Sequence, residues 1–348
     1  MMVVLFHLNA STHIRALTRN GYASVDFFFV LSGFVLMSGF GTRIGDPGAF
    51  RRFAVRRLAR LYPLHLFTLA VLIGLIGLDV ARNGGAMFVR PHDFPALLEC
   101  LALIQGFTTD QLSWNFPSWS ISIELWASLL FGLTLWLAGR RSSIVLGLYC
   151  LVLGTLLLGF GEPDGPAIDE PGALLKVDHY LLAFFAGALL FKLYERIDKA
   201  RHTPPTWAEP AAAAVVMVVF LWAGDFPALA TIGLFAVVIL VFAFDRGPIS
   251  KALQGRSFQA AGRWSYSIYL VHPFWTIAMF NAVRGAGAWS GQVASVIDGT
   301  GEHLVLGGPF AMDLAAAACL ALVLATASLT YRFVERPAQR LIARSAAS

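Results

Sequence analysis

Residues 25–36 read VDFFFVLSGFVL, an apolar run that opens with an aspartate, Asp26. The chain begins with another apolar run, MMVVLFHLNA at residues 1–10, which carries His7. A charged group in hydrocarbon costs roughly 2.5–3.5 kcal/mol even on lenient insertion scales, so ionisable residues in such runs are functional candidates by default. These two runs therefore predict both a membrane-embedded chain and a polar site inside it.

The composition agrees with a membrane environment. Hydrophobic residues make up 57% of the 348 residues, charged residues make up 14%, and the mean hydropathy is +0.68. A water-soluble domain of this size could not cover so much apolar surface with polar residues. We therefore predict an all-α, polytopic transmembrane helix bundle. The cysteines Cys100, Cys150 and Cys319 lie far apart, show no metal-binding spacing and are expected to be packing residues.

Apolar runs of nearly the ~20 residues that cross a bilayer predict about ten spans. They lie at residues 1–10, 24–40, 58–78, 120–138, 144–160, 177–194, 208–223, 228–244, 264–284 and 309–332. With both termini in the cytoplasm, most basic residues fall on the cytoplasmic side, as the positive-inside rule requires. The exceptions are Arg15, Arg19, Arg82, Arg90, Lys176 and Arg284. The net charge of +5 thus reflects membrane topology and does not indicate nucleic-acid binding.

We expect one transmembrane domain at residues 1–335 and a cytoplasmic tail at residues 336–348. The apolar run before His7 would cover only about 9 Å of a hydrocarbon core of about 30 Å, so the first helix is expected to be truncated. The segment at residues 96–107 is too short to cross and is expected to be interfacial or re-entrant. The acidic stretch 161–172 and the stretch 285–309 are expected to be outer loops without a folded domain.

An arginine cluster lies at the predicted cytoplasmic mouth of the third span, in FRRFAVRRLARLYP at residues 50–63. Arg56 and Arg60 are four residues apart and Arg57 and Arg60 are three apart, so one helix face presents several guanidinium groups. Guanidinium binds phosphate in a planar, bidentate manner, which suits a phosphorylated cytosolic ligand. The same residues would also anchor a helix against anionic lipid. The spacing alone leaves both interpretations open.

The acidic and histidine residues each have a structural and a functional interpretation. His7 suits proton exchange near neutral pH, although a lone histidine in an apolar run is commonly a hydrogen-bonded core residue. Asp26 either caps a helix at the outer interface or orients an imidazole across the first two helices. Glu124, in PSWSISIELW at residues 117–126, is either a buried strut or a substrate-site carboxylate. His272 precedes Pro273, and this kinked polar position suits either helix packing or a cavity.

Five strings resemble the acyltransferase-3 family of membrane O-acyltransferases in order and approximate separation. They are VDFFFVLSGFVL, RRLARLYP, PSWSISIELW, YSIYLVHP and YRFVERP. The resemblance covers almost the whole chain. It implies a ten-helix protein of the bacterial cytoplasmic (inner) membrane that moves an acyl group, most often acetyl, from cytosolic acyl-CoA to a hydroxyl of a cell-surface or exported carbohydrate. Lipopolysaccharide O-antigen, capsule or exopolysaccharide, peptidoglycan and a small glycosylated metabolite all remain open as acceptors. The resemblance implies acyl-CoA as co-substrate, no permanently bound cofactor and no metal.

The resemblance also implies residue roles. His7 matches the family's first-helix histidine, Asp26 its second-helix aspartate, and Glu124 the glutamate of its tryptophan-serine string. Arg57 and Arg60 match an Arg-x-x-Arg pair thought to handle CoA, with Arg56 assisting. The substrate channel is expected to include Trp119, Ser120, Tyr266 and His272. Because the chain ends soon after the last span, no fused esterase-like domain is expected.

The resulting hypothesis is an acyl transfer in which His7 acts as general base or accepts the acyl group transiently. Asp26 or a nearby hydroxyl would hold the imidazole, and one cavity would join His7 to Arg57 and Arg60. Glu124 would help to seat the carbohydrate, together with three tryptophans that equally suit an interfacial belt. These are Trp114, Trp119 and Trp126.

Two alternatives remain open from the sequence. A proton-coupled secondary transporter or glycan flippase would use His7, Asp26, Glu124 and His272 as a proton relay, although the paired inverted repeats typical of transporters are not evident. A degenerate, non-catalytic family member would serve as a structural partner, and the short first helix is compatible with that role.

Overall fold

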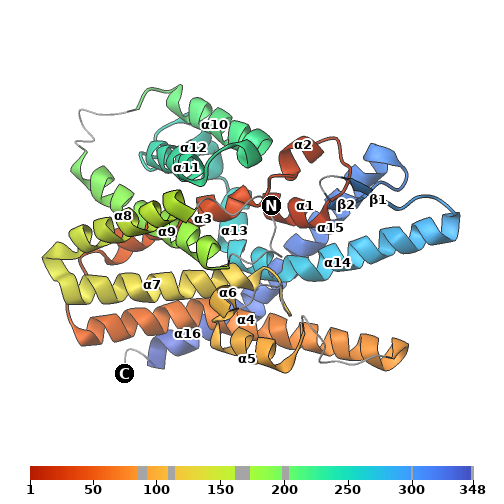
Figure 1. Cartoon of the computed structure of the whole chain (residues 1–348), viewed down its shortest axis with the longest axis horizontal. Coiled ribbons are helices and arrows are strands. Elements are labelled where there is room, and N and C mark those ends of the chain that lie inside the picture. Colours follow the sequence, from red (N-terminus) through yellow and green to blue (C-terminus); the bar gives the residue numbers. More distant parts are fainter. Residues whose placement is uncertain (85–91, 109–113, 161–172, 198–203, 299–300, 346–348) are drawn as a thin grey trace.

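The computed structural model describes residues 1–84, 92–108, 114–160, 173–197, 204–298 and 301–345. Long helices dominate these residues (Figure 1). The predicted acidic outer loop at residues 161–172 lies outside them, as do three basic residues used in the topology prediction, Arg90, Lys199 and Arg201.

Every predicted span contains a helix. The helices are α1 (Met2–Leu8), α3 (Ala23–Phe40), α4 (Pro47–Asn83), α7 (Ser118–Ala138), α8 (Ser142–Phe160), α9 (Ala173–Arg196), α10 (Ala208–Trp222), α11 (Ala228–Phe242), α14 (Ser265–Ser290) and α15 (Gly308–Thr330). Shorter elements connect them: α2 (Arg15–Thr18), α5 (Phe94–Ala102), α6 (Gln105–Thr108), η1 (Gly139–Arg141), η2 (Ala223–Asp225), α12 (Pro248–Leu253), α13 (Arg256–Arg263), η3 (Tyr331–Glu335) and α16 (Arg336–Ser345).

Five stretches of the described chain are long and apolar enough to cross a membrane. They are Ala23–Phe40, Pro47–Arg82, Ser118–Phe160, Val177–Arg196 and Gly308–Ile342. The helices α10 and α11 are apolar but shorter. The all-α membrane class predicted from composition is confirmed, whereas the number of crossings stays a prediction.

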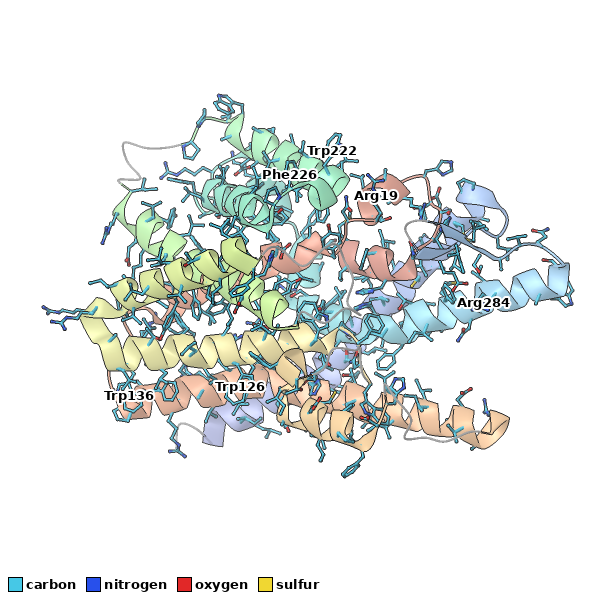
Figure 2. All side chains as sticks on the ribbon, in the orientation of Figure 1. Arg19, Trp126, Trp136, Trp222, Phe226 and Arg284 are labelled. Carbon is cyan, nitrogen blue, oxygen red and sulfur yellow. The ribbon has the colours of Figure 1, made fainter. Side chains whose placement is uncertain are left out.

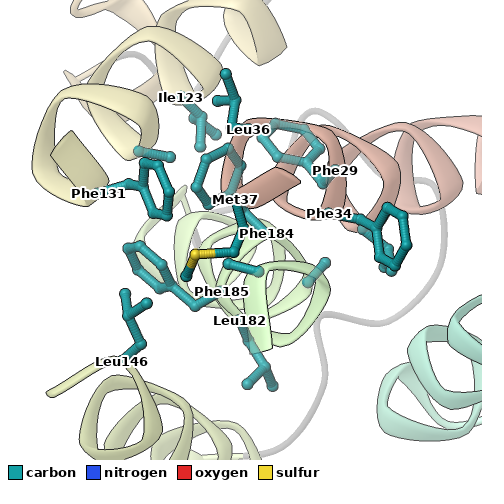
Figure 3. Close-up of a cluster of buried hydrophobic side chains, with 14 of the residues drawn as sticks. Phe29, Phe34, Leu36, Met37, Ile123, Phe131, Leu146, Leu182, Phe184 and Phe185 are labelled. Carbon is teal, nitrogen blue, oxygen red and sulfur yellow. The ribbon is translucent and has the colours of Figure 1, made fainter. Parts of the chain in front are cut away.

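The largest apolar core lies between α3, α7, α8 and α9 and is rich in phenylalanine (Figure 3). Within it, α3 and α9 are packed backbone to backbone. A Cβ atom added at Gly33 would lie 1.8 Å from the carbonyl oxygen of Phe184, and one added at Gly187 would lie 1.9 Å from that of Val30. Small residues permit such close helix contacts in membranes. The two glycines thus set the spacing between the helix that carries Asp26 and its neighbour.

The helices α4 and α7 lie side by side along one edge of the molecule (Figure 1). Helix α4 begins earlier than the predicted third span because Asp46 caps it. The Ala49 backbone N–H donates to Asp46 Oδ1 at 2.9 Å, and Pro47 occupies the first turn. This early start places the whole arginine cluster on one continuous helix.

The segment predicted to be interfacial or re-entrant forms two short helices, α5 and α6, separated by Leu103 in the left-handed conformation (φ 52°). Neither helix has the length of a span, as the sequence predicted. The predicted tail is helical at Arg336–Ser345, and this helix, α16, packs against α4. The tail therefore joins the bundle instead of extending away from it.

The predicted outer loop at residues 285–309 differs from expectation. Helix α14 continues to Ser290, and two antiparallel strands follow, β1 (Ser295–Asp298) and β2 (Gly301–Leu304). The sequence predicted an outer loop without a folded domain and gave no sign of the hairpin, because four-residue strands give too short a pattern to distinguish from irregular chain.

The hairpin holds the end of the first helix. Asn9 ends α1 in the left-handed conformation (φ 44°), and its backbone carbonyl accepts the Leu304 N–H at 3.0 Å. Its side-chain amide donates to the carbonyl oxygen of Glu302 at 2.7 Å. Because His7 lies two residues before Asn9, these bonds fix the end of α1 that presents the imidazole.

Candidate active site

Three sequence strings meet at Glu124, which lies inside α7. Its Oε1 accepts a hydrogen bond from Ser32 Oγ of α3 at 3.2 Å and an ion-paired hydrogen bond from Arg57 Nη2 of α4. Arg57 Nε also donates to Ser128 Oγ of α7 at 3.2 Å. Glu124 is only 2% exposed and is hydrogen-bonded to two other helices, as expected for a buried strut.

The remaining strings join the same network through α14. The Tyr266 hydroxyl donates to the carbonyl oxygen of Leu61 in α4. Ser120 donates to the Pro117 carbonyl, so the bond of 2.7 Å between the Ser120 and Tyr269 hydroxyls is donated by Tyr269. In turn, Ser267 Oγ donates to Glu335 Oε2 of η3 at 2.7 Å. Side chains from the five family-like strings thus form connected contacts across four helices and a π-helical turn.

The arginine cluster is divided by burial. Arg57 is 5% exposed and paired with Glu124, whereas Arg56 and Arg60 are exposed. The predicted guanidinium fork of all three residues is therefore not formed. Removing one partner of a buried ion pair leaves an uncompensated charge, so Arg57 and Glu124 depend on each other. Of these three arginines, Arg56 and Arg60 are the ones that a ligand can reach, and Arg51 and Arg52 earlier on α4 are exposed as well.

A cavity of ≈ 100 Å³ lies between α1, α3, α4, α7 and α14. Its wall combines a cation, a carboxylate and several hydroxyl groups with apolar side chains. The lining residues are Val3, Ser24, Val25, Phe28, Arg60, Leu61, Ser120, Ile121, Glu124, Ser265, Tyr266 and Tyr269. Glu124 Oε2 accepts no hydrogen bond from the described residues, although it is buried. Glu124 is thus a cavity-lining carboxylate with one oxygen that still has the capacity to accept a hydrogen bond.

The predicted cavity joining His7 to both arginines is found only in part. Arg60 lines it, and so does Val3, one helical turn before His7, but neither His7 nor Arg57 is among the lining residues. The His7 ring instead packs against Phe116, with ring centroids 4.6 Å apart. Arg57 is absent from the cavity lining because its guanidinium is held in the ion pair with Glu124.

Asp26 orients an imidazole, but that of His179 and not that of His7. His179 Nε2 of α9 donates to Asp26 Oδ1 at 2.6 Å. The alternative of a helix cap is also not met, because α3 begins at Ala23 and Tyr22 occupies the capping position. His179 was not singled out in the sequence, although a histidine within an apolar span was the available signal.

His7 and His272 lie against each other near the junction of α1 and α14. Their rings are 5.2 Å apart with an interplanar angle of 25°, and Phe116 contacts both rings. His7 is half-buried, whereas His272 is fully buried. The structure thus brings the opening run at residues 1–10 and the YSIYLVHP string together at two imidazoles.

The three tryptophans do not line the cavity. Trp114 is 3% exposed, and Trp119 packs against Tyr180 with ring centroids 5.0 Å apart. Trp126 is 44% exposed on α7, and its indole N–H donates to the carbonyl oxygen of Leu103 at 2.9 Å (Figure 2). Of the predicted channel residues, Ser120 and Tyr266 line the cavity, while Trp119 and His272 lie outside its lining.

Known proteins resemble this chain over most of its length. A family model described as an acyltransferase domain matches residues 1–332. The acyltransferase MdmB of Streptomyces mycarofaciens is 25% identical over 96% of this chain and 84% of its own. YrhL of Bacillus subtilis strain 168, named as a candidate peptidoglycan O-acetyltransferase, is 24% identical over 78% of this chain and 46% of its own. No solved structure matches the chain.

The family match decides among the interpretations that the sequence left open. It favours an enzyme over a transporter or flippase, because it covers residues 1–332, which contain four of the five strings and the first two residues of the last one. Apolar helices long enough to span a bilayer occur along the same region. The chain therefore belongs to the acyltransferase-3 family and is a multi-pass membrane acyltransferase.

Proposed function

We propose that this protein transfers an acyl group, acetyl in the first instance, from cytosolic acyl-CoA to a hydroxyl of an exported or cell-surface carbohydrate. The observation that carries the proposal is the cavity that is lined by both Arg60 and Glu124, a buried carboxylate whose Oε2 has no hydrogen-bond partner among the described residues. A cation suits the phosphates of a donor, and a free carboxylate oxygen suits a hydroxyl that donates a hydrogen bond. The bacterial inner membrane, with both termini in the cytoplasm, is the proposed location.

On the donor side, Arg60 and Arg56 bind the CoA phosphates from the cytoplasm. The two residues are four apart on α4 and both are exposed. Arg57 has a different role because its guanidinium is held by Glu124 and Ser128. Arg57 positions the Glu124 carboxylate, which lines the cavity. In the Arg-x-x-Arg pair, Arg60 then serves the donor side and Arg57 the acceptor side.

On the acceptor side, hydroxyl-bearing side chains line the cavity near Glu124. Ser120 and Tyr269 are already joined to each other, which leaves lone pairs on the Tyr269 oxygen for a ligand hydroxyl. The carbohydrate class of the acceptor is supported by YrhL, whose name refers to peptidoglycan. His7 acts as general base or as transient acyl acceptor on the α1 side of this site.

The test uses membranes that contain the full chain, incubated with acetyl-CoA labelled in the acetyl group. We expect alkali-labile label to appear in the polysaccharide fraction, because base cleaves O-acetyl esters. Arg60→Gln is expected to raise KM for acetyl-CoA by about tenfold, the equivalent of about 1.4 kcal/mol for one lost charge-assisted contact. The matched control is Arg141→Gln, an exposed arginine at η1 that lies outside the proposed site.

Glu124→Gln is expected to lower transfer at saturating acetyl-CoA, with Glu195→Gln as the control. Glu195 is an exposed α9 residue that forms an ion pair with Lys192, three residues earlier, at 3.0 Å. Two results would contradict the proposal. One is that membranes containing the wild-type protein put no label into the polysaccharide fraction. The other is that Arg60→Gln and Arg141→Gln label that fraction equally well.

A further inference from the structure

The structure leaves one question about the proposed transfer, namely what orients His7. A histidine that acts as base or nucleophile is normally held by a third group. The sequence suggested Asp26 for this role, but Asp26 accepts its imidazole hydrogen bond from His179 of α9. The imidazole that contacts His7 is that of His272, a residue with no exposed surface, and Phe6 and Phe116 are the other rings against it.

The backbone of α14 determines which nitrogen of His272 carries the hydrogen. In an α-helix the N–H of residue 273 would donate to the carbonyl of Tyr269, but Pro273 has no N–H. The His272 side chain takes its place: Nδ1 lies 2.6 Å from that carbonyl oxygen. A carbonyl oxygen can only accept, so Nδ1 must carry the hydrogen, and in the neutral imidazole Nε2 then carries the lone pair.

That lone pair is not engaged by the protein. His272 Nε2 is buried and accepts no hydrogen bond from the described residues. The His272 ring that carries this nitrogen lies 5.2 Å from the His7 ring, measured between centroids, and the Phe116 ring contacts both. A buried acceptor without a donor is costly unless a state of the protein uses it.

We infer that His272 is the positioning residue for His7, with its tautomer set by Pro273, and that its Nε2 accepts the His7 N–H when His7 takes a proton. The inference rests on the proposed function. During transfer, the acceptor oxygen bonds to the acyl carbon while His7 takes the hydroxyl proton. The carbon–sulfur bond then breaks, and the proton passes from His7 to the CoA thiolate.

Protonated His7 carries hydrogen on both nitrogens, so one N–H faces the acceptor oxygen and the other needs a partner. His272 Nε2 supplies that partner without bringing a permanent negative charge into the apolar bundle. The arrangement follows the general order of base, orienting group and fixed anchor, with the Tyr269 carbonyl as the anchor. Tyr269 also lines the cavity, so one residue connects the proposed transfer site with the histidine pair.

The first test compares two substitutions of His272 in the full-length protein. His272→Phe keeps an aromatic ring but has no acceptor, whereas the amide oxygen of His272→Gln can occupy the position of Nε2. We expect His272→Phe to lower kcat for transfer by about 100-fold, as for loss of acid–base assistance, with KM for acetyl-CoA unchanged. His272→Gln should recover a large part of that loss. Thr276→Val is the control, because Thr276 is buried one helical turn after His272 and its hydroxyl donates to backbone carbonyls of its own helix.

The second test uses Pro273→Ala, which restores a backbone N–H that competes with His272 for the Tyr269 carbonyl. Replacing a proline inside a helix should make the protein more resistant to thermal unfolding. We nevertheless expect kcat to fall by about tenfold, because the Tyr269 carbonyl then no longer holds the hydrogen of His272 on Nδ1. A more stable but slower enzyme is an outcome that a purely structural role of His272 does not produce.

A third measurement does not depend on acyl transfer. Diethyl pyrocarbonate modifies neutral imidazole nitrogens, and mass spectrometry reports the rate at each histidine. We expect His272→Phe to slow modification of His7 several-fold, with His272→Gln closer to wild type. His13 is the internal control, because its side chain is 65% exposed and it bonds Asp313 instead.

The outcomes separate the two proposals. If wild type shows no acetyl transfer but His7 modification still depends on His272, the proposed function fails and the positioning role stands. If wild type transfers acetyl and His272→Phe matches it in kcat and in His7 modification rate, the positioning role is wrong.

Discussion

At the scale of single residues, the site is defined by which partner each charged side chain has. The buried ion pair between Arg57 and Glu124 joins α4 to α7, and both side chains are less than a tenth exposed. Desolvation makes such a pair weak as a source of stability but strongly sensitive to loss of one member. The two residues therefore act as a unit.

Single and double substitutions distinguish this coupling from independent roles. Arg57→Met should lower the free energy of unfolding by about 3–5 kcal/mol, because Glu124 is left buried and charged. Arg57→Met combined with Glu124→Leu should recover most of that stability while transfer activity stays low. Thermal unfolding in detergent provides the measurement. As a control, Lys192→Met removes a partly exposed ion pair at the protein surface and should cost less than about 1 kcal/mol. Equal stability of the single and double variants would contradict the coupling.

At the scale of elements, α3 and α9 make a close backbone-to-backbone contact. Gly33 and Gly187 allow each helix to approach a backbone carbonyl of the other. This contact brings His179 to Asp26 and places the α3 residues Ser24, Val25 and Phe28 at the cavity wall. The spacing of two helices thus determines part of the site.

Adding one methyl group tests this contact. Gly33→Ala should destabilise the protein by about 1–3 kcal/mol, since the new Cβ would overlap the Phe184 carbonyl and force the helices apart. Gly39→Ala lies on the same helix with no atom within 4 Å of the added Cβ, and it should be neutral or stabilising by about 0.5–1 kcal/mol. Chemical unfolding of the two variants in detergent measures the difference. Equal stabilities would show that the contact is not tight.

At the scale of the whole molecule, the distribution of basic residues predicts which loops lie on the cytoplasmic side of the membrane and which on the outer side. The exposed Arg141 lies in η1 between α7 and α8, on the side predicted to be cytoplasmic. The exposed Gln292 lies between α14 and the hairpin, on the predicted outer side. Donor binding at Arg60 and hairpin contacts at α1 would then face opposite compartments.

Accessibility to a membrane-impermeant maleimide tests this orientation. In a Cys150→Ser background, Gln292→Cys should react in intact cells, whereas Arg141→Cys should react only after permeabilisation. Cys100 and Cys319 are buried and should contribute little background, and Cys150 is the half-buried thiol that the background removes. Labelling of both positions from the same side would refute the predicted topology.

The sequence predicted the elements well because their signals are local. Apolar runs located a helix at each predicted position, and the five strings named residues that do meet in space. The hairpin at residues 295–304 was missed, because its strands are too short for a period of two to be recognised. The early start of α4 was also missed, although Asp46 and Pro47 form a recognisable helix start.

The amino-acid sequence by itself determined that this is an α-helical membrane acyltransferase, because composition, run length and motif order do not depend on how the helices pack. Only the tertiary structure decided the pairing of side chains: Asp26 with His179, Arg57 with Glu124 and His7 with His272. Hydrogen bonds require donor and acceptor within about 3 Å. Which residues meet that distance depends on the rotation and separation of whole helices, which close contacts such as Gly33 against Phe184 set and no local pattern encodes.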